Sequence, residues 1–233
     1  MIDILYAKYQ WLNQFSVNDY KLLTVFWNIF LAFIPAVIVA YINDYWDNIK
    51  FIKLYHKFFV IVLMFVWLIF APNSIYIITD IRHLLDYCPI DSPKRVCVVN
   101  AWMIPWFFLY ASLGWIFFVY LLRQMSNLIK KIFNQTIAKL IIIAAMPFIS
   151  LGVLLGLINR WNSWDIFFNP LQIINSGLVY FQDFRYFNNW LSFTVCLYIL
   201  YFLGKNLFIK SVVESHIWSK FSNFCKFFQK LFR

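Results

Sequence analysis

The chain contains little charge and little glycine. Only 13% of its 233 residues are charged, whereas a soluble domain carries about 25%. The five glycines form neither a phosphate-cradling loop nor a Gly-x-Ser-x-Gly nucleophile elbow, and no His-x-x-x-His pair offers the spacing of a zinc site. These absences argue against soluble hydrolases and nucleotide-binding proteins, and we expect neither a cofactor nor a bound metal.

Apolar and aromatic residues make up most of the chain. They account for 63% and 23% of it, and the mean hydropathy is +0.71. Several apolar runs approach the roughly 20 residues that a helix needs to cross a bilayer. The sequence therefore predicts an all-α fold, a polytopic transmembrane helical bundle of about five spans with interfacial amphipathic helices beside it. The expected spans are 22–42, 58–78, 98–122, 140–158 and 190–209.

Composition divides the chain into three parts. We expect an N-terminal interfacial segment (1–21), a transmembrane bundle of one domain (22–210) and a basic amphipathic cytoplasmic tail (211–233). In the tail, phenylalanines share one helical face and basic residues the other, which is typical of a helix lying in the membrane interface. The basic face predicts binding to anionic membrane lipids. Docking of a partner protein is the alternative, and a homo-oligomer is left open.

The net charge of +10 lies on one side of the predicted bundle. The N-terminal segment and the loops after spans two and four carry seven basic and seven acidic residues, and the other side carries 13 and three. Basic residues favour the cytoplasmic side of a membrane. We therefore expect the N-terminus outside and the C-terminus in the cytoplasm. A basic surface in this place also argues against nucleic acid as a partner.

A polar stripe ends the second span, in residues 72–83 (the first motif). Pro72 removes a helical hydrogen bond and predicts a kink. Beyond it, polar side chains fall within about 120° of one another on a helix. They are Asn73, Tyr76, Thr79, Asp80 and His83. Polar groups at the end of a membrane helix cost free energy unless they find partners, so this stripe predicts a site at the outer leaflet.

A second polar cluster follows the fourth span, in residues 160–165 (the second motif). It reads Arg160, Trp161, Asn162, Ser163, Trp164 and Asp165. Asn162 or Ser163 is expected to cap a short helix with Asp165 in its first turn, and the paired tryptophans suit a membrane interface. A further helix is expected to start at Pro170 with Asn169 as its cap.

The two motifs in this order resemble the bacterial membrane family catalogued as domain of unknown function 1361 (DUF1361). The resemblance runs from about the first span to the fifth. Related sequences often have a proline directly before the tyrosine, where this chain has Ile75, which favours a continued helix here. The resemblance implies a multi-pass protein of the bacterial plasma (inner) membrane. It implies no activity.

The predicted topology places both motifs on the outer side. If spans two and four pack together, the candidate binding residues are brought into one site. They are Asn73, Tyr76, Thr79, Asp80, His83, Arg160, Trp161, Asn162, Trp164 and Asp165. Arg160 is then expected to pair with Asp80 or Asp165 and neutralise a buried charge. The site is either a structural polar clasp or a ligand or catalytic pocket, and a metal site is the weakest alternative because no third ligand is evident.

Two classes of function remain from the sequence. One is a membrane enzyme that binds or processes a lipid-type substrate, with Asp80 and His83 as the candidate catalytic acid and base and Arg160 holding an anionic group. The other is a non-catalytic scaffold or partner-binding module. A transporter is disfavoured because spans one, three and four contain no Asp, Glu, Lys, Arg or His.

Two cysteines lie in the outer loop after the second span. Cys88 and Cys97 form a disulfide in an oxidising compartment, or they remain free thiols. The sequence leaves both alternatives open.

Overall fold

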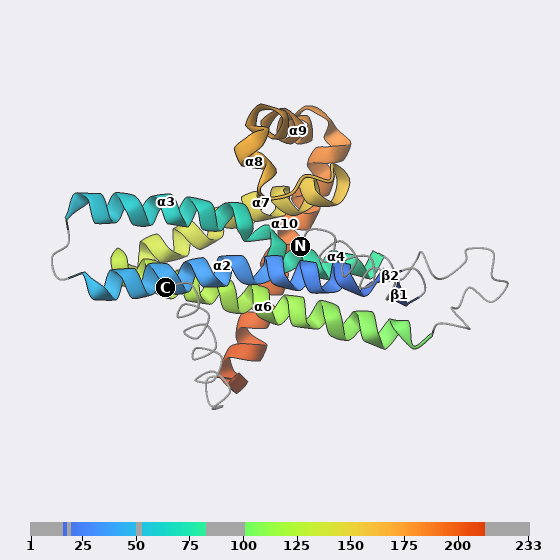
Figure 1. Ribbon diagram of the computed structural model, residues 1–233, viewed down its shortest axis with the longest axis horizontal. Helices are drawn as coiled ribbons and strands as arrows, with labels where there is room; N and C mark the ends of the chain where they lie inside the picture. Colours follow the sequence, from blue (N-terminus) through green and yellow to red (C-terminus); the bar gives the residue numbers. More distant parts are fainter. Residues whose placement is uncertain (1–15, 18–19, 50–52, 83–100, 213–233) are drawn as a thin grey trace, which may run out of the picture.

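The computed structural model describes residues 16–17, 20–49, 53–82 and 101–212 (Figure 1). Five helical segments within this part of the chain are long and apolar enough to cross a membrane, which confirms the helical multi-pass architecture that the sequence predicts. The expected N-terminal interfacial segment up to residue 15, His83, the Cys88–Cys97 pair and the tail from residue 213 lie outside the described residues.

The elements follow one another in a simple order. Two short strands pair antiparallel before the first long helix. The elements are β1 (Ser16–Val17), β2 (Tyr20–Lys21), α2 (Leu22–Asn48), α3 (Leu54–Phe70), α4 (Pro72–Thr79), the 3-10 helix η1 (Asp80–Arg82), α6 (Met103–Ile132), α7 (Gln135–Ile158), α8 (Asp165–Phe168), α9 (Pro170–Gln182) and α10 (Phe184–Val212).

Two helices end well beyond the predicted spans. The sequence predicts ends at residues 42 and 122, whereas α2 continues to Asn48 and α6 to Ile132. The added turns carry charged residues, and Lys131 of α6 forms an ion pair with Asp47 of α2. The predicted ends came too early because hydropathy detects only the part of a helix inside the bilayer. The backbone hydrogen bonds of the helix continue past that part.

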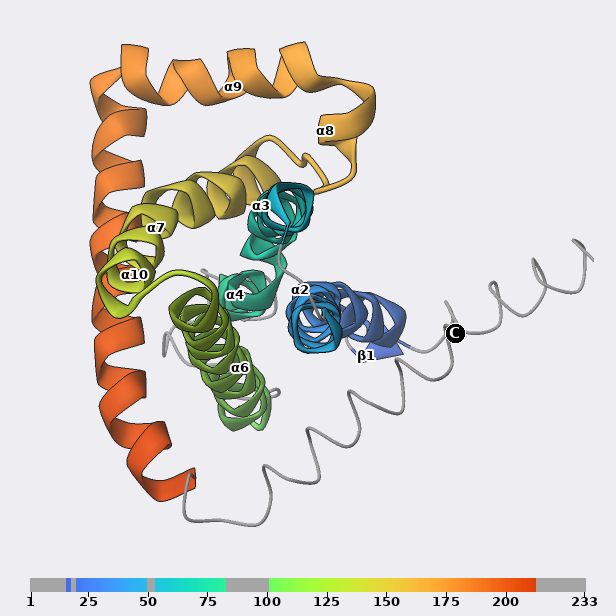
Figure 2. The ribbon, with the colours of Figure 1, turned by 90° about the vertical axis from the view of Figure 1, so that its left-hand side faces the viewer.

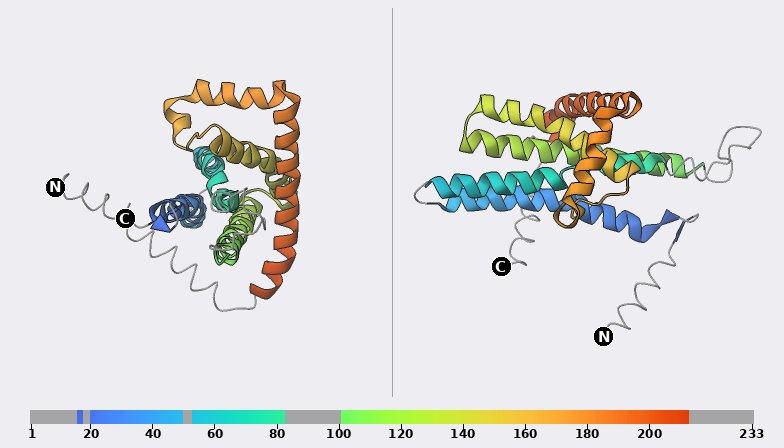
Figure 3. Two further views of the ribbon diagram at one scale, coloured as in Figure 1. Left: turned by 90° about the vertical axis from the view of Figure 1, so that its right-hand side faces the viewer. Right: turned by 90° about the horizontal axis from the view of Figure 1, so that it is seen from above.

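The long helices do not all run in one direction. The α2, α3 and α6 helices lie along a common axis, and α10 runs crosswise to them along one side of the bundle (Figures 1, 2 and 3). Hydrogen bonds tie α10 to its neighbours, among them one from Trp115 Nε1 to the Leu200 carbonyl at 2.7 Å and one from the Tyr198 hydroxyl to the Ile143 carbonyl at 2.7 Å. The five candidate spans therefore do not form an array of parallel helices, although the sequence gives them similar length and hydropathy.

One helix ends and the next begins at Pro72, where the sequence predicts a kink. Proline has no N–H for the Leu68 carbonyl, so α3 ends at Phe70 and α4 starts at Pro72, with Ala71 between them. The Ser74 amide and hydroxyl both donate to the Ala71 carbonyl, at 3.1 and 2.7 Å, and bridge the junction. The helix then continues through Ile75, which is buried, so the expected helical path between Asn73 and Tyr76 is confirmed.

A glycine lets α7 contact this junction. A Cβ atom on Gly152 would lie 2.5 Å from Pro72 Cγ, closer than any side chain tolerates. Small residues allow membrane helices to approach in this way. The end of α7, and with it the second motif, is therefore positioned directly beside the start of the first motif.

The α8 and α9 helices leave the bundle and fold back over the end of α7 (Figure 2). Tyr180 is buried against Leu154 and Leu155 and donates to Asn159 Oδ1 at 3.3 Å. Its burial and the neighbouring Tyr186 raise the pKa of Tyr180 to about 12, so it remains a hydrogen-bond donor at neutral pH. The predicted helix start at Pro170 is confirmed, although Asn169 makes no side-chain cap.

Candidate functional site

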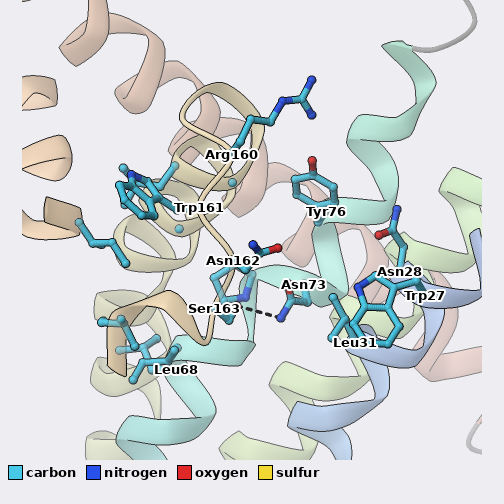
Figure 4. Close-up of a pocket in the computed structure, with 17 residues that line it drawn as sticks. Trp27, Asn28, Leu31, Leu68, Asn73, Tyr76, Arg160, Trp161, Asn162 and Ser163 are labelled. Atoms are coloured by element: carbon cyan, nitrogen blue, oxygen red, sulfur yellow. Dashed lines mark hydrogen bonds between the residues drawn. The ribbon is translucent and has the colours of Figure 1, made fainter. Parts of the chain in front are cut away.

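A cavity of about 300 Å³ lies between α2, the α3–α4 junction, α7 and the second motif (Figure 4). We call it the polar cavity. Its polar lining comes from Asn28, Asn73, Tyr76, Arg160, Asn162 and Ser163, and its apolar lining includes Trp27, Leu31, Leu68, Pro72 and Trp161. Its volume is at the lower end of the range for small-molecule sites.

The two polar motifs touch at this cavity. Asn73 Nδ2 donates to Ser163 Oγ at 3.0 Å, although 90 residues separate them in the sequence (Figure 4). One turn of α7 beyond Gly152, Gly156 lies against the Tyr76 ring and the Trp161 carbonyl. The local structure on both sides allows this contact. Pro72 starts a new helix, and Gly152 and Gly156 place no side chain between α7 and that helix.

Arg160 has a backbone conformation that most residues avoid. Its φ angle is 62°, in the left-handed region where glycine or asparagine usually ends a helix. The Asn159 and Trp161 amides both donate to the Leu155 carbonyl, at 3.1 and 3.3 Å, and close the end of α7. The turn therefore holds an arginine where glycine is the easier choice. The Arg160 guanidinium and the Tyr76 hydroxyl lie on the same side of the cavity (Figure 4).

Side-chain hydrogen bonds hold the rest of the second motif. Trp161 Nε1 donates to Ser176 Oγ of α9 at 3.1 Å. Asp165 Oδ2 accepts from the Asn162 amide at 2.7 Å and from Asn162 Nδ2 at 3.2 Å. The expected cap by Asn162 or Ser163 is wrong, because Trp164 precedes α8 and no side chain caps this helix. Asp165 lies in the first turn, as expected, and its side chain accepts from the backbone of Asn162.

The side chains of the polar stripe in the first motif do not all face the polar cavity. Asn73 and Tyr76 face the polar cavity, whereas Thr79 Oγ1 donates to the Tyr76 carbonyl of its own helix at 2.6 Å. Asp80 is buried, and its Oδ2 accepts from Asn28 Nδ2 of α2 at 3.0 Å. Asp80 lies where α4 tightens into η1, and a 3-10 turn changes the direction in which successive side chains point.

The predicted charge pairs are not formed. Within the described part of the chain, no ion pair joins Arg160 to Asp80 or Asp165. Asn28 donates a hydrogen bond to Asp80, and Asn162 donates to Asp165. Trp164 packs edge-on against Trp27, with ring centroids 6.1 Å apart, and does not line the cavity. The described residues also contain no group of three side chains that could hold a metal ion.

The cavity contains residues that sequence reasoning missed. Asn28 lines the cavity and also donates to Asp80, so it connects the two. The signal was present, since Asn28 is a polar residue in the apolar run of the first span, where polar groups tend to have a role. No pattern in the sequence distinguishes Leu31 or Leu68 from the other leucines.

The family comparison covers the whole cavity. A family model described as protein of unknown function (DUF1361) matches residues 27–204, a range that includes every residue lining the cavity. No curated protein and no solved structure shows significant similarity to the chain.

Proposed function

The chain is a multi-pass membrane protein that belongs to the family of proteins of unknown function DUF1361, and we propose that its polar cavity binds the headgroup of an anionic lipid. The observation that carries the proposal is the charge of the lining. Arg160 is the one charged side chain among the residues that line the cavity, and the other polar ones are uncharged. The lining therefore favours a ligand with negative charge.

The side chains around Arg160 suit a phosphate-bearing headgroup. A guanidinium presents parallel N–H donors that match two phosphate oxygens. The Tyr76 hydroxyl and the amides of Asn28 and Asn162 add uncharged donors and acceptors to the lining, and these can bind hydroxyl or ester groups of a headgroup. Trp27 and Trp161 supply aromatic surface of the kind found where membrane and water meet.

The depth of the cavity supports a headgroup in it. The α3 helix has 17 residues and is about 26 Å long, close to the roughly 30 Å of the hydrocarbon core. Lys53 and Lys57 stand at one end of this helix, and the polar cavity adjoins the other. With the lysine end at the cytoplasmic surface, the cavity lies at the level of the outer headgroups.

Asp80 serves in this proposal as a positioning residue. It lies behind Asn28, holds the amide through the 3.0 Å hydrogen bond and is not part of the cavity lining. Figure 4 shows the Asn28 amide oxygen turned toward the cavity side. The roles of Asp80 and His83 as catalytic acid and base stay a prediction, and the geometry supports binding without requiring a reaction.

Calorimetric titration of the purified protein with the water-soluble lipid dihexanoyl phosphatidylglycerol tests the proposal. The wild type should bind it saturably, and Arg160→Gln should bind it at least about tenfold more weakly, since a charge-assisted hydrogen bond is worth about 1.5–3 kcal/mol. Arg185→Gln, which removes an exposed arginine of α10, is the matched control and should bind as the wild type does. Equal binding by the Arg160→Gln variant and the wild type contradicts the proposal.

The 3.0 Å hydrogen bond between Asn73 and Ser163 favours a second candidate, a structural clasp that joins the two helix ends without a ligand. In that case Asn73→Ala lowers the melting temperature, and Arg160→Gln changes no binding property. The two candidates are thus separated by the titration.

A further inference from the structure

A second cavity adjoins the polar one. It has a volume of about 420 Å³ and lies between α3, α6 and α7, and we call it the apolar groove. No polar atom contributes to its lining, which is formed by apolar side chains of the three helices, among them Ile61, Phe65, Leu68, Ile129, Ala144 and Phe148. Leu68 lines both cavities, so they adjoin at this side chain.

The groove has a buried floor and open sides. Met125 and Ile129 of α6 form the floor and are almost fully buried. Phe65 of α3 and Phe148 of α7 form part of the walls and are 60% and 62% exposed. Ala144 is a small residue in the α7 wall, and its missing side-chain volume helps to keep the groove open.

The two cavities follow one another along α3, with the apolar groove beside Ile61–Leu68 and the polar cavity beside the end of the helix from Leu68 onward. Figure 4 shows Leu68 at the end of the polar cavity that is farthest from Arg160. From Leu68 the groove continues toward Ile61, seven residues back along α3, which is about 10 Å of helix. This length fits within one leaflet, about half of the roughly 30 Å hydrocarbon core.

We propose that the apolar groove holds an acyl chain of the same lipid whose headgroup occupies the polar cavity. The inference rests on the proposed function and adds the place of the acyl chain, so that the ligand is recognised by its chain as well as by its headgroup. The order of the two cavities matches the order of groups in a lipid. Arg160 and the polar lining correspond to the headgroup, and the apolar walls beyond Leu68 correspond to the acyl chain. The groove also leads from the proposed headgroup level toward the bilayer interior, the direction that a chain of the outer leaflet takes.

The test compares two phosphatidylglycerols that differ only in chain length, dihexanoyl and didecanoyl, by calorimetric titration of the full-length protein. The wild type should bind the didecanoyl lipid at least about tenfold more tightly, because each additional buried methylene favours binding. Ala144→Phe, which fills the groove from an exposed position, should remove this preference and leave the affinity for the dihexanoyl lipid unchanged. Val62→Phe adds bulk at an exposed position of α3 that does not line the groove, and it should keep the preference.

The outcomes separate this inference from the proposed function. If the dihexanoyl lipid binds but Ala144→Phe keeps the full chain-length preference, the groove does not hold the chain and only the further inference falls. If the dihexanoyl lipid does not bind the wild type at all, the proposed headgroup site falls and takes the inference with it. If Ala144→Phe changes the oligomeric mass in detergent instead of the chain-length preference, the groove is a contact between copies of the chain, which also overturns the inference.

Discussion

At the scale of single residues, Arg160 is the central residue of the proposed binding site. It occupies a left-handed backbone conformation with φ of 62°, which costs a residue other than glycine about 1–2 kcal/mol. A turn that only had to end α7 would be more stable with glycine in this position. The presence of arginine in this position supports the proposal that its side chain binds a ligand.

Arg160→Gly should separate stability from binding. Because glycine adopts the left-handed conformation without strain, the variant should unfold at a higher temperature than Arg160→Ala, by an amount equivalent to about 1 kcal/mol. It should also lose binding of dihexanoyl phosphatidylglycerol, as Arg160→Gln does. Thermal unfolding in detergent and the titration measure the two effects. A glycine variant that is no more stable than the alanine variant would show that the turn is not strained.

The Asn28–Asp80 pair is a second residue-scale feature with a measurable consequence. Asn28→Leu removes the amide that donates to the buried Asp80 carboxylate at 3.0 Å, and leaving a buried polar group short of a partner costs about 1–3 kcal/mol. We expect Asn28→Leu to lower the stability by this amount. In the Asp80→Leu background the same change should cost much less, since the carboxylate is gone. Additive losses in the double variant would mean that the pair does not interact.

Sequence reasoning reached part of the site at this scale. Asn73, Tyr76, Arg160, Trp161 and Asn162 were candidates and line the cavity, because polar residues at the end of an apolar run stand out. The partners of Asp80 and Asp165 were not predictable. Helical spacing gives the face on which a side chain lies, but the nearest donor depends on packing between helices that are distant in the sequence.

At the scale of elements, the contact between α7 and the α3–α4 junction holds the site together. Gly152→Val should disturb it, since the first added carbon would lie 2.5 Å from Pro72 Cγ and overpacking costs about 1–3 kcal/mol. Gly177→Ala is the matched control. The nearest atom to its new Cβ is Leu151 Cδ2 at 3.8 Å, an ordinary contact, so its stability should not fall. Thermal unfolding of the two variants measures the difference, and equal stability would contradict this role for Gly152.

The positions of the membrane helices were predictable, but their ends and directions were not. Hydropathy located all five candidate spans, because burial in lipid requires apolar side chains along about 20 residues. It could not indicate that α10 runs crosswise to α2, α3 and α6 (Figure 2). That direction depends on contacts such as the hydrogen bond from Trp115 to Leu200, which involve one residue on each helix and leave no periodic pattern.

At the scale of the whole molecule, charge is distributed unevenly between the two ends of the bundle. The α2–α3 and α6–α7 turns and the helix ends beside them carry Lys53, Lys57, Lys130, Lys131 and Lys139. Lys131 contacts Asp47 and Asn43 of α2. The ion pair is exposed and contributes at most about 1 kcal/mol to stability. The remaining positive charge is available to set the orientation in the membrane, since basic residues favour the cytoplasmic side.

Single cysteines in a cysteine-free background test this orientation. Thr136 at the start of α7 and Asn162 in the second motif are both exposed and stand at opposite ends of α7. Asn162→Cys should react with a membrane-impermeant thiol reagent added to intact cells, and Thr136→Cys should react only after the cells are opened. A C-terminal reporter should be cytoplasmic. Reaction of both cysteines in intact cells would contradict the predicted topology.

The central claim is that the two polar motifs form one binding site for an anionic lipid, and native mass spectrometry of the protein extracted from its own membrane tests it most directly. The wild type and Arg185→Gln should each retain one anionic lipid per chain after mild detergent extraction, whereas Arg160→Gln should be recovered folded and without it. Identical lipid adducts on the wild type and Arg160→Gln, or a wild type that carries no lipid at all, would contradict the claim.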